Sequence, residues 1–239
     1  MLATQIQLDG ITPQRVWVSP TFCPNAKSLP NRLANRYLDA LLAGDQQFAS
    51  RLVFQAFDSG MGLREIYLRI FQPSLRLAAC LWQQNEVTVA QEQYLVAATQ
   101  CIMSELYPYI ASTPKSGRRL VATNLCGDVH ELGLRMVADL FELEGWEVDY
   151  LGANVPADAV LEIAAAREPD VLAISVSITD YLPVAEQLIV RLRARKDCDR
   201  VKVLVGGYPF NLNSGLWNEI GADGYAPDAA QAVSVAVRL

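Results

Sequence analysis

Residues 119–133 read RLVATNLCGDVHELG, and this stretch marks the start of a regular pattern in the second half of the chain. A short apolar run ends at Cys126, a glycine follows, and helical spacing begins near Glu131. Further apolar runs lie at 146–152, 171–177, 201–207 and, more weakly, 223–227. Helical segments are expected at 131–144, 157–167, 182–195, 214–220 and 228–239. This alternation predicts an α/β fold with a doubly wound, parallel, five-stranded Rossmann-like (flavodoxin-like) sheet.

The first half of the chain has a different period. Residues 1–29 contain several prolines and no clear repeat, so we interpret them as an extended N-terminal arm. From residue 30 to 111 the apolar spacing predicts a four-helix bundle. Its helices are expected at about 30–44, 46–57, 63–84 (with a kink at Pro73) and from Thr88 onward. Residues 112–118, STPKSGR, are the predicted linker to a second domain at 119–239.

Composition excludes several classes of protein. The chain has 239 residues, of which 51% are hydrophobic and 19% charged, and its formal net charge is −6. These values are typical of a globular protein and argue against an extended nucleic-acid surface. No apolar run has the length of a membrane span, and the N-terminus lacks a signal-peptide pattern. The five cysteines include no Cys-x-x-Cys pair, which fits a reducing cytoplasm.

The loop after the first predicted strand carries the pattern Asp128-x-His130-x-x-Gly133. A neutral imidazole is a good ligand for a transition metal. A carboxylate two residues away can accept the other ring N–H and fix the tautomer. The glycine removes a side chain where a bulky group would approach the backbone. On spacing alone, a histidine that only caps the following helix remains an alternative.

The residues around this pattern resemble a known family. Asp-x-His-x-x-Gly after the first strand is similar to the signature of cobalamin-binding Rossmann domains. Ser175-Val-Ser177-Ile-Thr179 resembles the Ser-x-Leu segment of that family, with Ser177 at the usual leucine, and Gly206-Gly207 resembles its glycine pair. The resemblance implies that His130 binds cobalt in place of the dimethylbenzimidazole of the cofactor. Ser175 and Thr179 would then lie near the buried base, and the three glycines, at positions 133, 206 and 207, would leave room for the nucleotide tail.

The predicted bundle also carries a resemblance. ACLWQQNEVTVAQEQ, residues 79–93, is similar to the segment above the corrin in light-sensing, cobalamin-dependent transcriptional repressors (the CarH family). That segment has Trp, nine residues, then Glu-His. Trp82, Val89 and Glu92 occupy the matching positions here, and Gln93 replaces the histidine. The resemblance implies that these four residues cap the upper face of the cofactor.

These observations leave more than one function open. Only about 29 residues precede the bundle, and the basic runs at 115–119 and 191–202 suit a linker and a solvated helix face, so direct DNA binding is not expected. A cobalamin-dependent sensor, similar to the AerR-type antirepressors, is the favoured interpretation; it would act on a transcription regulator or by homo-oligomerisation, with light as a candidate signal. The alternative is a corrinoid protein that carries a methyl group in a methyltransferase system. A haem-binding relative is disfavoured by Ser175 and the glycine pair. The sequence does not distinguish adenosylcobalamin, methylcobalamin and hydroxocobalamin.

Overall fold

The structure is a computed structural model that describes residues 31–239; the predicted arm at 1–29 lies outside the described residues. Helices form the first half of the described chain: α1 (Arg32–Leu42), α2 (Gln46–Asp58), α3 (Leu63–Ile66), a π-helical turn η1 (Tyr67–Phe71), α4 (Gln72–Gln83) and α5 (Val89–Ala111). A capping box at Thr88 and Gln91 starts α5, as the spacing of these residues predicts. The helical bundle expected from the apolar spacing is therefore present.

Pro73 affects the third helical segment differently from the prediction. In place of a simple kink, the backbone widens into the π-helical turn at Tyr67–Phe71, and the proline lies in the first turn of α4. Proline has no N–H to donate to the carbonyl four residues earlier, which here belongs to Arg69. That carbonyl accepts a hydrogen bond from the Asn31 side chain at 3.2 Å, while the Asn31 oxygen caps α1. Because the π turn leads directly into α4, the helical segment continues past the proline without a break.

The second half of the chain is a parallel sheet of five strands in the order β2-β1-β3-β4-β5. The strands are β1 (Arg119–Leu125), β2 (Glu147–Val155), β3 (Val171–Ser175), β4 (Lys202–Gly206) and β5 (Gly224–Ala226). The connecting helices are α6 (Leu132–Leu143), α7 (Ala157–Arg167), α8 (Leu182–Arg193), α9 (Tyr208–Leu212), α10 (Leu216–Glu219) and the C-terminal α11 (Ala229–Ala236). All five predicted strands are found, and the Rossmann-like fold is confirmed. The short helix α9 was not predicted.

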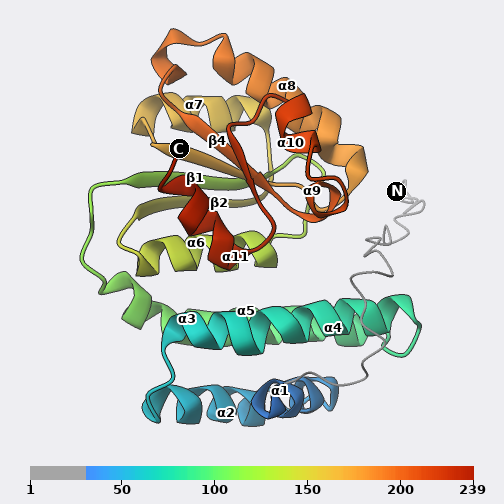
Figure 1. Cartoon of the computed structure of the whole chain (residues 1–239). Coiled ribbons are helices and arrows are strands. Elements are labelled where there is room, and N and C mark those ends of the chain that lie inside the picture. Colours follow the sequence, from blue (N-terminus) through green and yellow to red (C-terminus); the bar gives the residue numbers. More distant parts are fainter. Residues whose placement is uncertain (1–30) are drawn as a thin grey trace, which may run out of the picture.

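Each face of the sheet packs against its own group of helices. Successive residues of one strand alternate between two apolar clusters; Leu120 and Ala122 belong to one, and Val121 belongs to the other. The first cluster continues through α6 and α11 into the bundle, and the second contains residues of α7, α8 and α9. Figure 1 shows these layers, with α6 and α11 between the sheet and the bundle. The bundle and the sheet thus share one continuous core.

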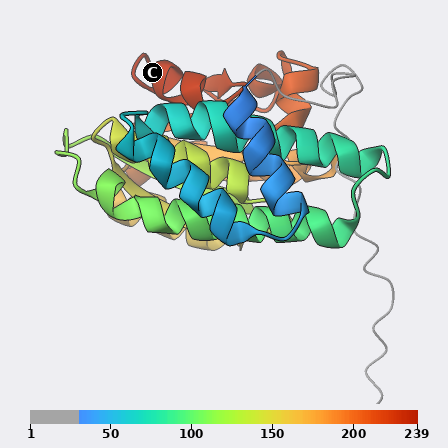
Figure 2. The same ribbon diagram turned by 90° about the horizontal axis from the view of Figure 1, so that it is seen from below.

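The bundle has two layers below the sheet domain. Helices α3, α4 and α5 lie nearest to α6, and α1 and α2 cross them on the outer side (Figures 1 and 2). Buried apolar side chains from α1, α2, α4 and α5 fill the space between the layers. Within residues 31–239, no helix is both long enough and apolar enough to cross a membrane.

A polar seam crosses the contact between the bundle and α6. The Tyr67 hydroxyl donates to Asp139 Oδ2 at 2.7 Å, and Arg135 Nε donates to Asp139 Oδ1 at 2.8 Å. On the same helix, Glu142 accepts from the Tyr107 hydroxyl at 3.1 Å. Burial raises the pKa of Asp139 to about 6, although Tyr67 and Arg135 oppose the shift. Above about pH 6, the ionised Asp139 side chain therefore destabilises the folded protein relative to its neutral form.

The Asp139→Asn variant tests this cost. A raised native pKa means that the contribution of Asp139 to stability is full below about pH 4 and is lost as pH rises through about 6. The shift corresponds to about 3 kcal/mol at most. We expect the unfolding free energy of Asp139→Asn, relative to wild type, to increase by up to about this amount between pH 4 and pH 8. Denaturant unfolding across this range measures it, and a pH-independent difference would contradict the assignment.

Candidate functional site

The loop after β1 is held in place by two neighbouring segments. Gly127 has φ of 93°, and its N–H donates to Asn154 Oδ1 at 2.8 Å at the end of β2. The Tyr181 hydroxyl donates to the Gly127 carbonyl at 2.7 Å. A Cβ at position 127 would approach the Tyr181 ring to 2.8 Å, so glycine is required here for both conformation and space. This fixed turn sets the position of Asp128 and His130.

Asp128 joins His130 to the end of β3. The Asp128 side chain is 1% exposed, and its Oδ2 accepts the Ser177 backbone N–H at 2.8 Å. Its Oδ1 accepts the Ser177 hydroxyl at 2.7 Å and the His130 backbone N–H at 3.1 Å. His130 Nδ1 lies 3.4 Å from Asp128 Oδ1 and 3.2 Å from Ser177 Oγ. The ring therefore turns Nδ1 toward two oxygens, which leaves Nε2 for a ligand.

The charge of Asp128 is stabilised by these contacts. Burial by itself raises the pKa of Asp128, but the hydrogen bonds from His130 and Ser177 outweigh it, and the pKa lies below its ordinary value. The carboxylate is thus ionised at neutral pH and accepts hydrogen bonds only. This favours the His130 tautomer that carries its proton on Nδ1. The His130 side chain itself is 43% exposed and lines a cavity.

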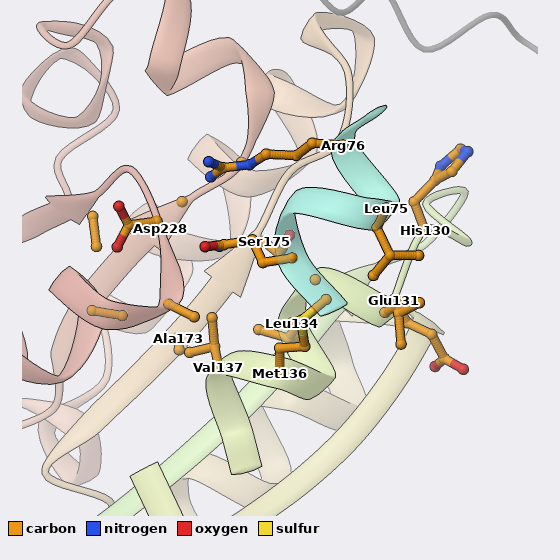
Figure 3. Close-up of a pocket in the computed structure, with 18 of the residues that line it drawn as sticks. Leu75, Arg76, His130, Glu131, Leu134, Met136, Val137, Ala173, Ser175 and Asp228 are labelled. Atoms are coloured by element: carbon orange, nitrogen blue, oxygen red, sulfur yellow. The ribbon is translucent and has the colours of Figure 1, made fainter. Parts of the chain in front are cut away.

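That cavity has a volume of about 560 Å³ and lies between the bundle and the carboxyl ends of β3, β4 and β5. Its bundle wall comes from α4 and α5, and its opposite wall from α6, α11 and the strand ends. Figure 3 shows His130 and Glu131 at one end and Asp228 at the other. Most of the deep wall is apolar, with side chains such as Leu134, Val137 and Ala173. An apolar cavity of this size with few polar groups suits an organic ligand.

Seven of the twelve predicted site residues line this cavity: Glu92, Gln93, His130, Gly133, Ser175, Gly206 and Gly207. Asp128 and Ser177 lie behind His130 and hold it. Thr179 begins a 3-10 turn, η2 (Thr179–Tyr181), and is not among the lining residues. Trp82 and Val89 occupy the corner between α4 and α5 but do not line the cavity, so their contact with a ligand stays a prediction.

Two of the predicted positions, 133 and 207, hold glycine for different structural reasons. A Cβ at position 133 would meet no atom within 4 Å, so Gly133 faces open space in the cavity wall. A Cβ at position 207 would collide with the Val176 carbonyl, and Gly207 has φ of 109°. Backbone packing alone therefore requires glycine at 207, whereas only the space in the cavity explains it at 133.

On the bundle side, Glu92 lies in the first turn of α5 and accepts a hydrogen bond from Gln93 at 2.9 Å. Burial raises the pKa of Glu92, and the Gln93 hydrogen bond opposes this shift. Four other polar residues of the site were not predicted from the sequence. Two lie in the cavity wall, Arg76 and Asp228, and two contact the loop after β1, Asn154 and Tyr181. The spacing of Gln72, Leu75, Arg76 and Ala79, which all line the cavity, marks one face of α4 and could have indicated Arg76.

Known proteins share this arrangement. The family described as B12 binding domain matches residues 118–234, and a second family of the same description matches 33–107. A dimethylamine corrinoid protein of Methanosarcina barkeri is 32% identical over 179 residues, which cover 74% of this chain and 78% of the relative. The chain belongs to the B12-binding corrinoid proteins. A corrinoid protein of Desulfitobacterium hafniense is 26% identical over 212 residues, or 87% of this chain and 97% of the relative.

A solved structure agrees with the fold. The monomethylamine corrinoid protein of Methanosarcina barkeri matches with a TM-score of 0.76 at 24% identity, over 86% of this chain and 97% of that one. Cobalamin is therefore the cofactor of this corrinoid protein, as the sequence resemblance implies. The site fits it: His130 presents a free ring nitrogen, Gly133 leaves space beside it, and the apolar slot continues to Ser175 and α11.

Replacement of His130 tests the cobalt ligand. We expect His130→Ala to lose the spectrum of histidine-bound, base-off cobalamin, because no other imidazole exists in the chain. Asp128→Asn should weaken affinity about 10–100-fold, since it removes the acceptor that orients the ring. Absorption titration of the apo protein measures both. A His130→Ala protein with the wild-type spectrum would contradict the ligand assignment.

The two glycines form a matched pair of variants. Gly133→Ala should leave stability within about 1 kcal/mol of wild type, because its Cβ meets nothing, yet weaken cobalamin binding about tenfold by filling cavity space. Gly207→Ala should cost at least about 2 kcal/mol of stability before any cofactor is added. Thermal unfolding of the apo proteins and cobalamin titrations separate the effects. Wild-type affinity in Gly133→Ala would show that the cofactor does not need this space.

Proposed function

We propose that this protein carries a methyl group on the cobalt of its cobalamin and exchanges it with methyltransferase partners. The observation that supports this most directly is the length of the match to the relatives. The alignment with the Desulfitobacterium hafniense corrinoid protein spans 97% of that relative and so includes both the bundle and the sheet domain. The relatives reported above are named as corrinoid proteins, two of them for methylamines, and none is named as a regulator.

The sensor interpretation rests on a short segment. The Trp82–Gln93 resemblance to light-sensing repressors covers one helix corner, and neither Trp82 nor Val89 lines the cavity. Glu92 and Gln93 of the same segment do line the cavity, but the relatives give no support to transcription regulation or light sensing. The carrier role, which the sequence left as the alternative, is the better supported of the two.

The residues of this chain suit a carrier in three ways. When bound, cobalamin supplies a cobalt centre that can accept a methyl group and release it to a second acceptor. His130 would bind the cobalt, and Asp128 with Ser177 would hold its ring in place through Nδ1. The bundle covers the cavity with Leu75, Ala79 and Val96, which limits the access of water. A partner enzyme must displace this cover to reach the cofactor, and the proposal therefore requires motion of the bundle relative to the sheet domain.

Methyl exchange with an enzyme partner tests the proposal. Cobalamin-loaded protein is reduced and mixed with a methyltransferase that uses mono-, di- or trimethylamine, together with that amine as the methyl donor, and absorption follows the methylation of cobalt. We expect methylation to need the methyltransferase and to be at least about tenfold faster with cobalamin held by this protein than with free cobalamin at equal concentration, because the protein positions the cofactor. His130→Ala is the matched control.

A second arm tests the sensor. The adenosylcobalamin complex is sized by chromatography before and after green light, and we expect no change in its oligomeric state. A light-dependent change in size, together with no methylation by any of the three enzymes, would reverse the proposal in favour of a sensor.

A further inference from the structure

Arg76 is a cation in a cavity that otherwise offers apolar and acidic side chains. It extends from α4 on the bundle side and reaches across the cavity toward Asp228 (Figure 3). Among the described residues that line the cavity, it is the one lysine or arginine; the other charged groups are Glu92, Glu131, Asp228 and the titratable His130. Its position between the His130 end and the Asp228 end places it beside whatever occupies the cavity.

Arg76 lies in a partly apolar cavity wall, and Asp228 is a charged group near it. Desolvation lowers the pKa of Arg76, and the charge of Asp228 opposes the shift only in part. Asp228 is already engaged as the N-cap of α11, where its two oxygens accept from Gln231 N at 2.8 Å and Gln231 Nε2 at 3.2 Å. A guanidinium has five N–H donors in a planar fork, so it can contact a carboxylate and a ligand oxygen at the same time. Arg76 therefore lies where an oxygen of a ligand in the cavity can accept from it.

Cobalamin carries oxygen acceptors that match such a group. Carboxamide oxygens surround the corrin ring, and one phosphodiester lies in the nucleotide tail. Arginine forms charge-assisted hydrogen bonds with oxygens of both kinds and bidentate contacts with phosphate. We propose that Arg76 is a cofactor-binding residue that donates to a peripheral oxygen of the corrinoid. Through it, the bundle makes a polar contact with cobalamin, while His130 binds from the sheet domain. The inference rests on cobalamin binding and is independent of methyl transfer.

The test compares two cofactors on the apo protein. Hydroxocobalamin has both kinds of oxygen, whereas cobinamide keeps the ring carboxamides and lacks the phosphodiester and the base. The Arg76→Gln variant lacks one charge-assisted hydrogen bond and should bind the cofactor about 10–100-fold more weakly than wild type does. The Arg76→Lys variant keeps the charge, so its loss of affinity should be smaller. A loss with both cofactors assigns the contact to a ring carboxamide. A loss with hydroxocobalamin alone assigns it to the phosphodiester.

Controls separate this role from a structural one. Arg69→Gln, on the same helical segment, removes an exposed arginine that does not line the cavity and should bind both cofactors as wild type does. Arg76→Gln should keep the melting temperature of the apo protein and the histidine-bound spectrum at saturating hydroxocobalamin. Unchanged affinity of Arg76→Gln for both cofactors would overturn the proposal.

A further variant distinguishes cofactor binding from an ion pair that only closes the bundle. Asp228→Asn keeps a good helix N-cap and removes the negative charge. If Arg76 acts on cobalamin, Asp228→Asn should bind hydroxocobalamin at least fivefold more tightly than Arg76→Gln does. Equal losses in the two variants would show that the Arg76–Asp228 attraction, and not a contact with the cofactor, sets the affinity, and would also overturn the proposal.

Discussion

The carboxylate of Asp128 is buried at the point where the sheet reverses its strand order, and three loops meet around it. It accepts hydrogen bonds from the loops after β1 and β3, and the Asp128 carbonyl accepts the Asn154 N–H from β2 at 3.0 Å. An isolated buried carboxylate would be expensive, and these donors offset the cost. Because the same contacts orient His130, the geometry that stabilises the fold at this edge also orients the predicted cobalt ligand. Ligands in such sheets bind at this switch point.

Much of the architecture could be predicted because local patterns and tertiary structure agree. Strands buried on both faces, such as β1 and β3, appear as continuous apolar runs, and the helix α7 has the predicted bounds of 157–167. The π turn before Pro73 could not be predicted from the local pattern, and the Arg69 carbonyl that the proline leaves without an N–H donor finds its partner 38 residues away, in Asn31. Likewise, α9 has only five residues, too few for a period to be visible.

The site shows the same division between local and long-range information. The spacing of Asp128, His130 and Gly133 indicates a metal ligand because all three lie within six residues, where the loop after β1 enters α6. The role of Ser177 depends on a contact across 49 residues, between two strand ends that are adjacent only in the folded sheet. Its place at a position where the family usually has leucine suggests a change in the tail slot, but the hydroxyl instead hydrogen-bonds to the Asp128–His130 pair. Arg76 was missed for a similar reason, because a helical arginine is usually a solvated one.

Two kinds of contact join the bundle to the sheet domain, and they respond differently when the two parts move relative to each other. The shared apolar core resists separation, since exposing it would cost about 25 cal/mol per Å². The polar seam joins Tyr67 of the bundle to Arg135 and Asp139 of α6, and α6 begins two residues after His130. Buried polar contacts lose their geometry over short displacements, whereas apolar surfaces tolerate sliding. A bundle that moves to admit a partner would therefore keep the seam as its fixed point and separate first at the cavity, where Arg76 and Glu92 face open space.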